Sequence, residues 1–234
     1  YSRSIKTYKR WLINFTFVFL NTLALRFLFP VLAASFAGIC SQYNIGFLNY
    51  FNIPIWIALI LAFLLLDLGI WLQHLLFHHI SFLWRFHKIH HSDEEVDFTT
   101  GVRFHPLEII ISMIYKFILL AVIGPPVALV IIFEIVLNAS SIFNHGNIKI
   151  SKSFDIALRK LIVTPNMHRI HHSAEEKETN SNYGFNLSVW DKLFGTYNKR
   201  SKKRDNIIIG LKELNNKNKS LFFLIFSPFK ISKD

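Results

Sequence analysis

The chain contains a single cysteine, Cys40, among its 234 residues. One thiol cannot form an intrachain disulfide, and it rules out a metal or iron–sulfur site built only from cysteine. Two common metal-binding strings are also missing: His-Glu-x-x-His, typical of zinc proteases, and Glu-x-x-His, typical of soluble di-iron helix bundles. Any metal site in this chain must therefore be built from other ligands.

Charged residues are scarce in four long apolar stretches, at residues 11–36, 53–73, 107–123 and 126–143. Each stretch is close to the roughly 17–25 residues that a helix needs to cross a bilayer. The Gly-Pro-Pro sequence at 124–126 predicts a tight turn that joins the last two stretches into a helical hairpin. We therefore expect an all-α integral membrane fold with about four transmembrane helices, in which residues 1–234 form a single domain.

Lysine and arginine are missing from the two short connectors, residues 37–52 and 124–126. Four basic residues lie in 1–10, three in 79–106 and seventeen in 144–234, within a net charge of +11. This asymmetry is the positive-inside pattern of membrane proteins, so it predicts that both termini and a histidine-rich helical domain are cytoplasmic. The membrane would be a bacterial inner membrane or the endoplasmic reticulum. The basic residues 199–204 suit lipid headgroups, and we expect no nucleic-acid binding.

Histidine is concentrated in three clusters that hold eight of the eleven histidines. The first is His74 with His78, and the string His-x-x-His-His-Ser then occurs twice, at 87–92 and 168–173. Residues three and four apart share one face of a helix, so each cluster presents its imidazoles together. Neutral imidazole is a frequent ligand of transition metals, and eight are too many for one four-coordinate ion. The clusters therefore predict a dinuclear site of iron or zinc.

A mononuclear iron site is an alternative, because His91-Ser92-Asp93 could supply part of a two-histidine, one-carboxylate triad. That triad normally lies on a β-barrel, which this sequence does not predict.

The helix that carries the first cluster is expected to run unbroken from Ile53 to about His79. At about 1.5 Å per residue it is longer than the hydrocarbon core of roughly 30 Å, so its last turns should project into the cytoplasm. Shorter helices are expected at residues 82–92 and 155–173. The apolar residues 221–229 are too short to span and are expected to lie in the membrane interface.

Charges within the apolar stretches each cost about 2.5–3.5 kcal/mol on insertion scales, so each calls for an explanation. Lys116 and Glu134 lie at similar distances from the turn at 124–126, so the hairpin predicts an ion pair between them. Asp67 precedes His74 by seven residues on the same helical face. A carboxylate in that position could orient ligand imidazoles through hydrogen bonds.

These motifs occur together in an order that resembles one family. The matching segments are residues 67–78, 83–92, 103–108, 143–147, 164–173, 182–184 and 190–196. Across roughly residues 60–198, the chain resembles the fatty acid hydroxylase superfamily, also called the sterol desaturase family. Its members are integral-membrane non-haem di-iron oxygenases.

The resemblance implies two iron ions and no catalytic side chain beyond their ligands. The implied ligands are His74, His78, His87, His90, His91, His145, His168, His171 and His172. His79 remains an alternative to His78, because the spacing of the first cluster varies in the family. The resemblance and the neighbouring motifs place Asp67, His105 and Asn144 beside the ligands as supporting residues.

The activity that the resemblance implies is O₂-dependent hydroxylation of a C–H bond in a membrane lipid, fatty acyl or sterol-like substrate. Desaturation or ether-lipid cleavage at the same site is an alternative. The sequence offers no haem-binding segment, no Gly-x-Gly-x-x-Gly after a strand and no cysteine set, so we expect a separate electron donor: a reductase, a ferredoxin or a cytochrome b5-like protein. A divalent-metal transporter is less favoured, because transporters hold their ligands near the bilayer midplane.

Overall fold

The computed structural model describes residues 5–29, 31–51, 53–203, 206–214 and 219–230, and within these ranges the chain is helical without a strand. The long helices are α1 (Ile5–Leu28), α4 (Ile55–His79), α6 (Pro106–Ile123) and α7 (Val127–Asn144). The shorter helices are α2 (Ala33–Gln42), α3 (Phe47–Tyr50), α5 (Ser81–His91), α8 (Lys152–Leu158), α9 (Pro165–His171), α10 (Glu176–Thr179), α11 (Val189–Leu193) and α12 (Leu221–Phe226). Single 3-10 turns form η1 (Thr100–Val102), η2 (Lys212–Leu214) and η3 (Ser227–Phe229).

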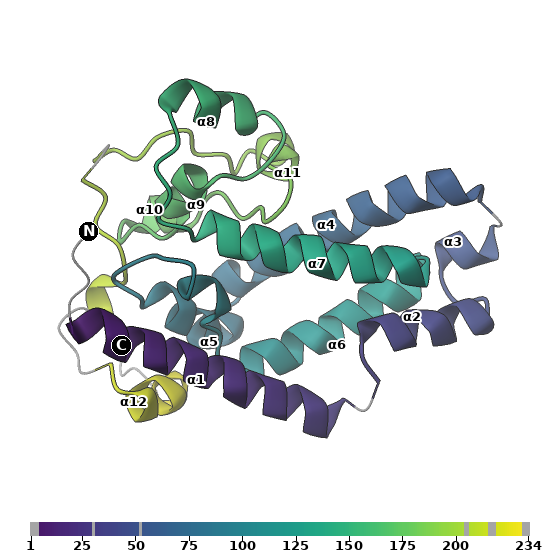
Figure 1. Cartoon of the computed structure of the whole chain (residues 1–234), viewed down its shortest axis with the longest axis horizontal. Helices are drawn as coiled ribbons and strands as arrows, with labels where there is room; N and C mark the ends of the chain where they lie inside the picture. Colours follow the sequence, from purple (N-terminus) through teal and green to yellow (C-terminus); the bar gives the residue numbers. More distant parts are fainter. Residues whose placement is uncertain (1–4, 30, 52, 204–205, 215–218, 231–234) are drawn as a thin grey trace.

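Four helical segments of the described chain are long and apolar enough to cross a membrane. They are Thr7–Tyr50, which contains α1 to α3, then α4, α6 and α7. The turn between α6 and α7 lies at the same end of the molecule as α2 and α3, whereas α5 and α8 to α12 gather at the other end, where α1 begins (Figure 1). The expected all-α membrane architecture is therefore confirmed, with the histidine-rich helices together at one end.

The first apolar stretch is not one helix, which corrects the expectation of a single segment over residues 11–36. Helix α1 ends at Leu28 and α2 begins at Ala33. The sequence between them contains Pro30, and proline has no N–H to continue a helical hydrogen-bond ladder. Helix α2 then packs through Ala33 and Ala37 into the same apolar core as α4, α6 and α7.

The core of the membrane part lies where α2, α4, α6 and α7 meet, and small residues bring their backbones close together. Ala58 and Ala62 on α4 are buried there with Leu120 and Phe133. A Cβ added at Gly69 would lie 2.5 Å from Leu119 Cδ1 on α6, so a larger residue at this crossing would require the Leu119 side chain to move. Small residues at helix crossings are the usual means of close packing in membranes.

The expected hairpin of α6 and α7 is confirmed, together with its ion pair. Gly124 ends α6 in the left-handed conformation, with φ 67°, which glycine adopts without strain. The antiparallel helices place Lys116 Nζ 2.7 Å from Glu134 Oε1. Both side chains are mostly shielded from solvent by the protein, so each charge offsets the cost of burying the other.

This pair makes a stability prediction. We expect Glu134→Gln to destabilise the protein by about 2–3 kcal/mol, because Lys116 would then keep an uncompensated charge within the span. The double variant Lys116→Met with Glu134→Leu should regain most of that loss, and unfolding of detergent-solubilised protein by denaturant would measure it. A double variant no more stable than Glu134→Gln would contradict the coupling.

The helix expected over residues 155–173 is in fact two helices, α8 and α9, separated by an extended segment. Pro165 occupies the first turn of α9, and the residue before a proline disfavours the helical region. Thr164 therefore adopts an extended conformation and caps α9 by accepting a hydrogen bond from Met167 N. In contrast, the helix expected to end near His79 is continuous, and α5 begins within one residue of the expected position.

The apolar segment 221–229 forms α12 and η3, which run across the histidine-rich end of the molecule. Leu224 is fully buried against Phe17 of α1 and Ile89 of α5. This contact connects the C-terminal segment to the helix that carries the second histidine cluster. Its expected position in the membrane interface remains a prediction.

Candidate metal centre

Four segments bring nine buried histidines together at the histidine-rich end of the molecule. They come from the last turns of α4, from α5, from the residue that ends α7, and from α9 with the residue after it. Within each of two groups, the candidate ligand nitrogens all lie within 4.8 Å of one another. The five-histidine group is His74, His78, His87, His91 and His171, and the four-histidine group is His90, His145, His168 and His172. Every one of these side chains is at most 8% exposed.

The two His-x-x-His-His strings divide between the groups in opposite ways. In the second cluster, His87 and His91 join the five-histidine group and His90 joins the other; in the third, His168 and His172 join the four-histidine group and His171 joins the other. Helix geometry explains why the first and last histidines of each string share a group. The last histidine, at i+4, is rotated about 40° around the helix axis from the first, whereas the middle one, at i+3, is rotated about 60° in the opposite direction.

The inward-facing nitrogens in the four-histidine group converge. His145 Nε2 lies 3.1 Å from Nε2 of His90, 3.1 Å from Nε2 of His172 and 3.0 Å from Nε2 of His168. Neutral imidazole has one N–H, so four converging nitrogens cannot all be satisfied by hydrogen bonds to one another. Two nitrogens bound to one ion at about 2.1 Å and at right angles lie about 3.0 Å apart. The spacing fits a shared cation.

The five-histidine group shows the same signs of a missing partner. His74 Nε2 lies 3.2 Å from His87 Nε2. The buried Nε2 atoms of His78, His91 and His171 have no hydrogen-bond partner among the described residues. Unpaired buried nitrogens are costly in a folded protein, and a metal ion would satisfy all of them.

Hydrogen bonds behind the imidazoles set which nitrogen faces inward. Nδ1 donates to a backbone carbonyl in three of them: His74 to Tyr183 O at 2.7 Å, His145 to Ser141 O at 2.7 Å and His171 to Ser181 O at 2.8 Å. A carbonyl can only accept, so Nδ1 carries the proton and the Nε2 lone pair is directed into the group. Such outer partners fix the orientation of metal-binding histidines.

Burial also keeps these imidazoles neutral. It lowers the pKa of His87 to about 3 and that of His145 to about 4. It also lowers the pKa of His90, His168 and His172, and the neighbouring imidazoles add to that effect. Neutral imidazole is the form that binds metal ions, so the centre is ready to bind at physiological pH.

The carboxylate that contacts a candidate ligand is Glu108, not Asp67. Glu108 lies in the first turn of α6 and is buried, and its Oε1 is 2.6 Å from His87 Nδ1. Glu108 lies within the segment 103–108 that resembles the family, and no role was predicted for it. A glutamate in the first turn of a membrane helix, three residues after His105, was the available signal.

Asp67 and Asp191 together hold the segment 183–191 that passes behind the five-histidine group. Asp67 Oδ2 accepts hydrogen bonds from Trp190 Nε1 at 2.8 Å and Leu187 N at 3.3 Å. Asp191 accepts from Tyr183 N at 2.8 Å. Asp67 therefore holds the segment that follows Tyr183, whose carbonyl accepts from His74, and its supporting role for the ligands remains a prediction.

His105 also lies away from the centre, contrary to expectation. It caps α6, with Nδ1 accepting a hydrogen bond from Leu107 N at 3.2 Å, and its Nε2 lies 3.1 Å from Ile225 O. Its role is to start α6, on which Glu108 lies.

Asn144 directly precedes His145 and contacts Phe185, and its supporting role remains a prediction. Its Nδ2 donates to Phe185 O at 2.7 Å, and the Phe185 ring lies 5.0 Å from His74 and 6.1 Å from His168, measured between ring centroids. Of the two alternatives in the first cluster, His78 lies in the five-histidine group, whereas His79 is exposed and lies outside it.

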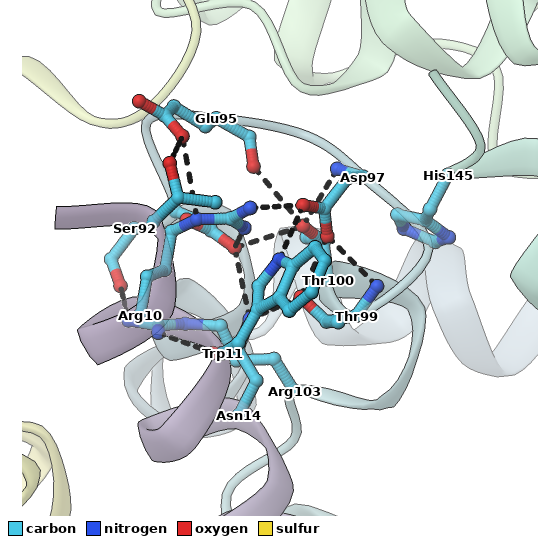
Figure 2. Close-up of polar contacts among 12 residues, drawn as sticks. Arg10, Trp11, Asn14, Ser92, Glu95, Asp97, Thr99, Thr100, Arg103 and His145 are labelled. Atoms are coloured by element: carbon cyan, nitrogen blue, oxygen red, sulfur yellow. Dashed lines mark hydrogen bonds and ion pairs between the residues drawn. The ribbon is translucent and has the colours of Figure 1, made fainter. Parts of the chain in front are cut away.

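A buried polar network ties α1 to the end of α5, as Figure 2 shows. Arg103 is fully buried and donates to Asn14 Oδ1 at 2.8 Å, to Ser92 Oγ at 3.0 Å and to Ile89 O at 3.0 Å. Arg10 donates to Asp93 Oδ2 at 2.8 Å and also to Asp97. Asp93 is therefore used in this network and lies outside both histidine groups, which argues against the two-histidine, one-carboxylate triad.

The same network positions η1 against His145 (Figure 2). Thr100 donates to Asp93, and Ser141 on α7 donates to Gly101 O at 3.0 Å. A Cβ at Gly101 would lie 3.0 Å from Ser141 O and 3.1 Å from His145 Nδ1. A side chain at position 101 would therefore push η1 away from the backbone and the ring on which the four-histidine group depends.

We expect Gly101→Ala to displace His145 by a few tenths of an ångström and to lower bound metal by severalfold, with a stability loss of about 1 kcal/mol. Metal analysis of the purified variant would measure the loss. Gly38→Ala is the matched control, because its Cβ would meet Val127 at an ordinary 3.9 Å. Equal metal content in the two variants would show that η1 has no part in placing His145.

The fold and the site define a membrane-spanning helical protein with a buried polyhistidine centre. The family model for fatty acid hydroxylase matches residues 59–196, more than half of the chain and a range that holds all nine histidines. The chain belongs to the fatty acid hydroxylase family.

Two curated relatives illustrate the family. Over 144 residues the chain is 31% identical to an ornithine lipid hydroxylase of Rhizobium tropici, covering 62% of this chain and 43% of the relative. Over 155 residues it is 29% identical to the alkylglycerol monooxygenase of Homo sapiens, covering 64% of this chain and 32% of the relative. The chain thus spans less than half the length of these relatives. No solved structure matches it significantly.

Proposed function

We propose that the protein is an O₂-dependent di-iron monooxygenase that hydroxylates a C–H bond of a membrane lipid, fatty acyl or sterol-like substrate. The observation that carries the proposal is the convergence of nine buried imidazoles into two groups. Imidazole alone suits zinc as well as iron. Family membership, with relatives named as a hydroxylase and a monooxygenase, favours iron. One ion would be held by the five-histidine group and the other by the four-histidine group.

Bound iron would supply the activation of O₂, with two electrons from outside the chain, so that one oxygen atom enters the substrate and the other leaves as water. The residues of this chain would hold the ions, orient the imidazoles and shield the centre from water. Carbonyls of Ser141, Ser181 and Tyr183 keep protons on the outer nitrogens, and Glu108 does so for His87. Complete burial of the imidazoles excludes water from the reacting centre.

Phe185 marks the side from which a lipid chain would approach. Its ring contacts His74 of one group and His168 of the other, and it also packs against the apolar core of the membrane part. A substrate carbon brought to this ring from the bilayer would lie beside both groups. The names of the relatives, a hydroxylase and a monooxygenase, favour insertion of oxygen over desaturation. Burial of the histidines at helix ends rather than midway along the spans disfavours a metal transporter.

Iron analysis and lipid mass spectrometry test the proposal. Protein made under iron-replete conditions should contain about two iron ions per chain. Lipid extracts from cells that make it should contain species heavier by one oxygen atom, and labelled O₂ should supply that atom. One metal ion per chain, or no O₂-derived product in reduced, iron-loaded samples, would end the proposal.

We further propose that both termini and the histidine-rich end face the cytoplasm, in a bacterial inner membrane or the endoplasmic reticulum. The distribution of lysine and arginine supports this orientation. Helix α1 begins at the histidine-rich end, and the connectors without basic residues lie at the opposite end (Figure 1). A cytoplasmic centre would also have access to a separate reductase, ferredoxin or cytochrome b5-like donor.

Reporter fusions should place the N-terminus and the C-terminus on the cytoplasmic side and position 44, between α2 and α3, on the other. The physical reason is the absence of basic residues from 37–52, which lets that connector cross the membrane. Activity of paired reporters, one active only in the cytoplasm and one only outside, measures the orientation. An outward C-terminus would contradict it.

A further inference from the structure

An open recess of about 450 Å³ lies on the surface next to the five-histidine group. The end of α4, helix α10 and the segment 195–199 form its walls, with His79, Lys177, Asn180, Tyr183 and Lys199 among the lining residues. These walls are polar, whereas sites for small molecules are mostly apolar.

The recess is separated from the five-histidine group by a single layer of residues. Three of its lining residues accept the outer hydrogen bonds of that group: Asn180 from His78 at 3.2 Å, Ser181 from His171 and Tyr183 from His74. A protein seated in the recess would therefore lie directly behind three of the five imidazoles.

Tyr183 connects the recess with the five-histidine group. Its ring lies against His74, His78 and His171, with centroid distances of 5.7, 5.1 and 5.8 Å. Its hydroxyl lies 3.1 Å from Nε2 of the exposed His79. A continuous set of contacts thus joins the recess to the five-histidine group.

The rim of the recess is positively charged. Lys177 and Lys199 are exposed on it, and the chain continues from the rim into Arg200, Lys202 and Lys203. Glu175 is neutralised by Lys203 at 3.2 Å and Lys212 at 3.1 Å. Helix α10 also carries the exposed Glu176 and the buried Glu178, which accepts hydrogen bonds from Ser201 Oγ and Lys202 N. The cations on and beside the rim still outnumber these carboxylates. Such a surface attracts an acidic protein and raises the rate of encounter.

We propose that this recess is the docking surface for an acidic one-electron carrier protein, and that electrons enter the centre through the five-histidine group. The proposal rests on the di-iron function above. Each reduced carrier gives up one electron and leaves oxidised, so two carriers dock in succession to supply the two electrons of one turnover.

Charge reversal at the rim tests the proposal, with two acidic carriers as probes: a plant-type ferredoxin and the soluble domain of cytochrome b5. We expect Lys177→Glu with Lys199→Glu to weaken carrier binding by roughly tenfold at low salt, measured by titration of the detergent-solubilised protein. The rate at which the reduced carrier is oxidised under anaerobic conditions should fall by a similar factor. Lys152→Glu, an exposed single reversal on α8 outside the recess, is the control and should change binding less than twofold.

Chemical reduction by dithionite, which needs no carrier protein, distinguishes failure of the docking surface from failure of the proposed di-iron function. Iron content and reduction by dithionite should be the same in the wild type and in the rim variant. Equal carrier binding by the rim variant and the wild type would overturn the docking surface, and so would an equal loss in Lys152→Glu. If neither carrier binds a wild-type protein that dithionite reduces, an acidic partner is excluded. A wild type that holds no iron would instead overturn the di-iron function.

Discussion

Replacing His145 with alanine should abolish product formation and lower bound metal, while the protein still inserts and folds. His145 Nε2 is within 3.1 Å of Nε2 of all three other members of the four-histidine group, so its loss removes the imidazole on which that group converges. We expect product formation to fall by more than about 100-fold, because replacing even an outer partner of a ligand costs 10–100-fold. Metal analysis and lipid mass spectrometry on the same preparation measure both effects.

His105→Ala is the control for that variant, since His105 is buried like His145 but caps α6 away from both groups. It should lower stability and leave the metal content close to that of the wild type. Full O₂-dependent activity in His145→Ala would show that the proposed ligand set is wrong. Lost expression of His145→Ala, with normal metal content in the protein that folds, would show a structural role instead.

Glu108→Leu should lower metal affinity or turnover by about 10–100-fold. The buried His87 Nδ1 would lose its acceptor at 2.6 Å, and the ring would no longer be held with Nε2 directed at His74. Glu108→Gln should be milder, because its amide oxygen can still accept from Nδ1. Metal titration followed by turnover measurements would rank the three proteins.

Glu134→Gln is the matched control, because Glu134 is also a glutamate of the helical hairpin but pairs with Lys116 and contacts no histidine of either group. It should reduce stability while metal affinity stays unchanged. If Glu108→Leu binds metal as Glu134→Gln does, then Glu108 has no role in orienting His87.

The membrane architecture could be predicted from the sequence because the bilayer sets the length of a spanning helix and makes an isolated charge within the span costly in free energy. Apolar stretches of the required length gave the spans, the residues around Gly124 gave the hairpin, and the cost of an isolated charge gave the pair of Lys116 with Glu134. The break before α9 was also marked, since Thr164 and Pro165 form a capped helix start. A single helix over residues 155–173, ending in the third histidine cluster, was expected without this local signal being used.

The details of the centre depended on contacts between segments far apart in the chain. The spacing of His87, His90 and His91 predicts that they lie close together on one helix. The group that each one joins depends on how α5 packs against α4, α7 and α9. Asp67 and Glu108 are both buried acidic residues of membrane helices, so sequence alone could not decide between them. The side chain that reaches His87 is set by the crossing of α5 and α6.

The opposite division of the two His-x-x-His-His strings has a consequence for how the centre assembles. Each of α5 and α9 supplies ligands to both groups, so neither metal position can be completed without the helices that form the other. An ion bound at one position would hold both helices in place, so the second ion would meet ligands whose motion is already restricted. The two ions should therefore load cooperatively, with few half-filled molecules at intermediate metal, and a chelator should remove them as a pair.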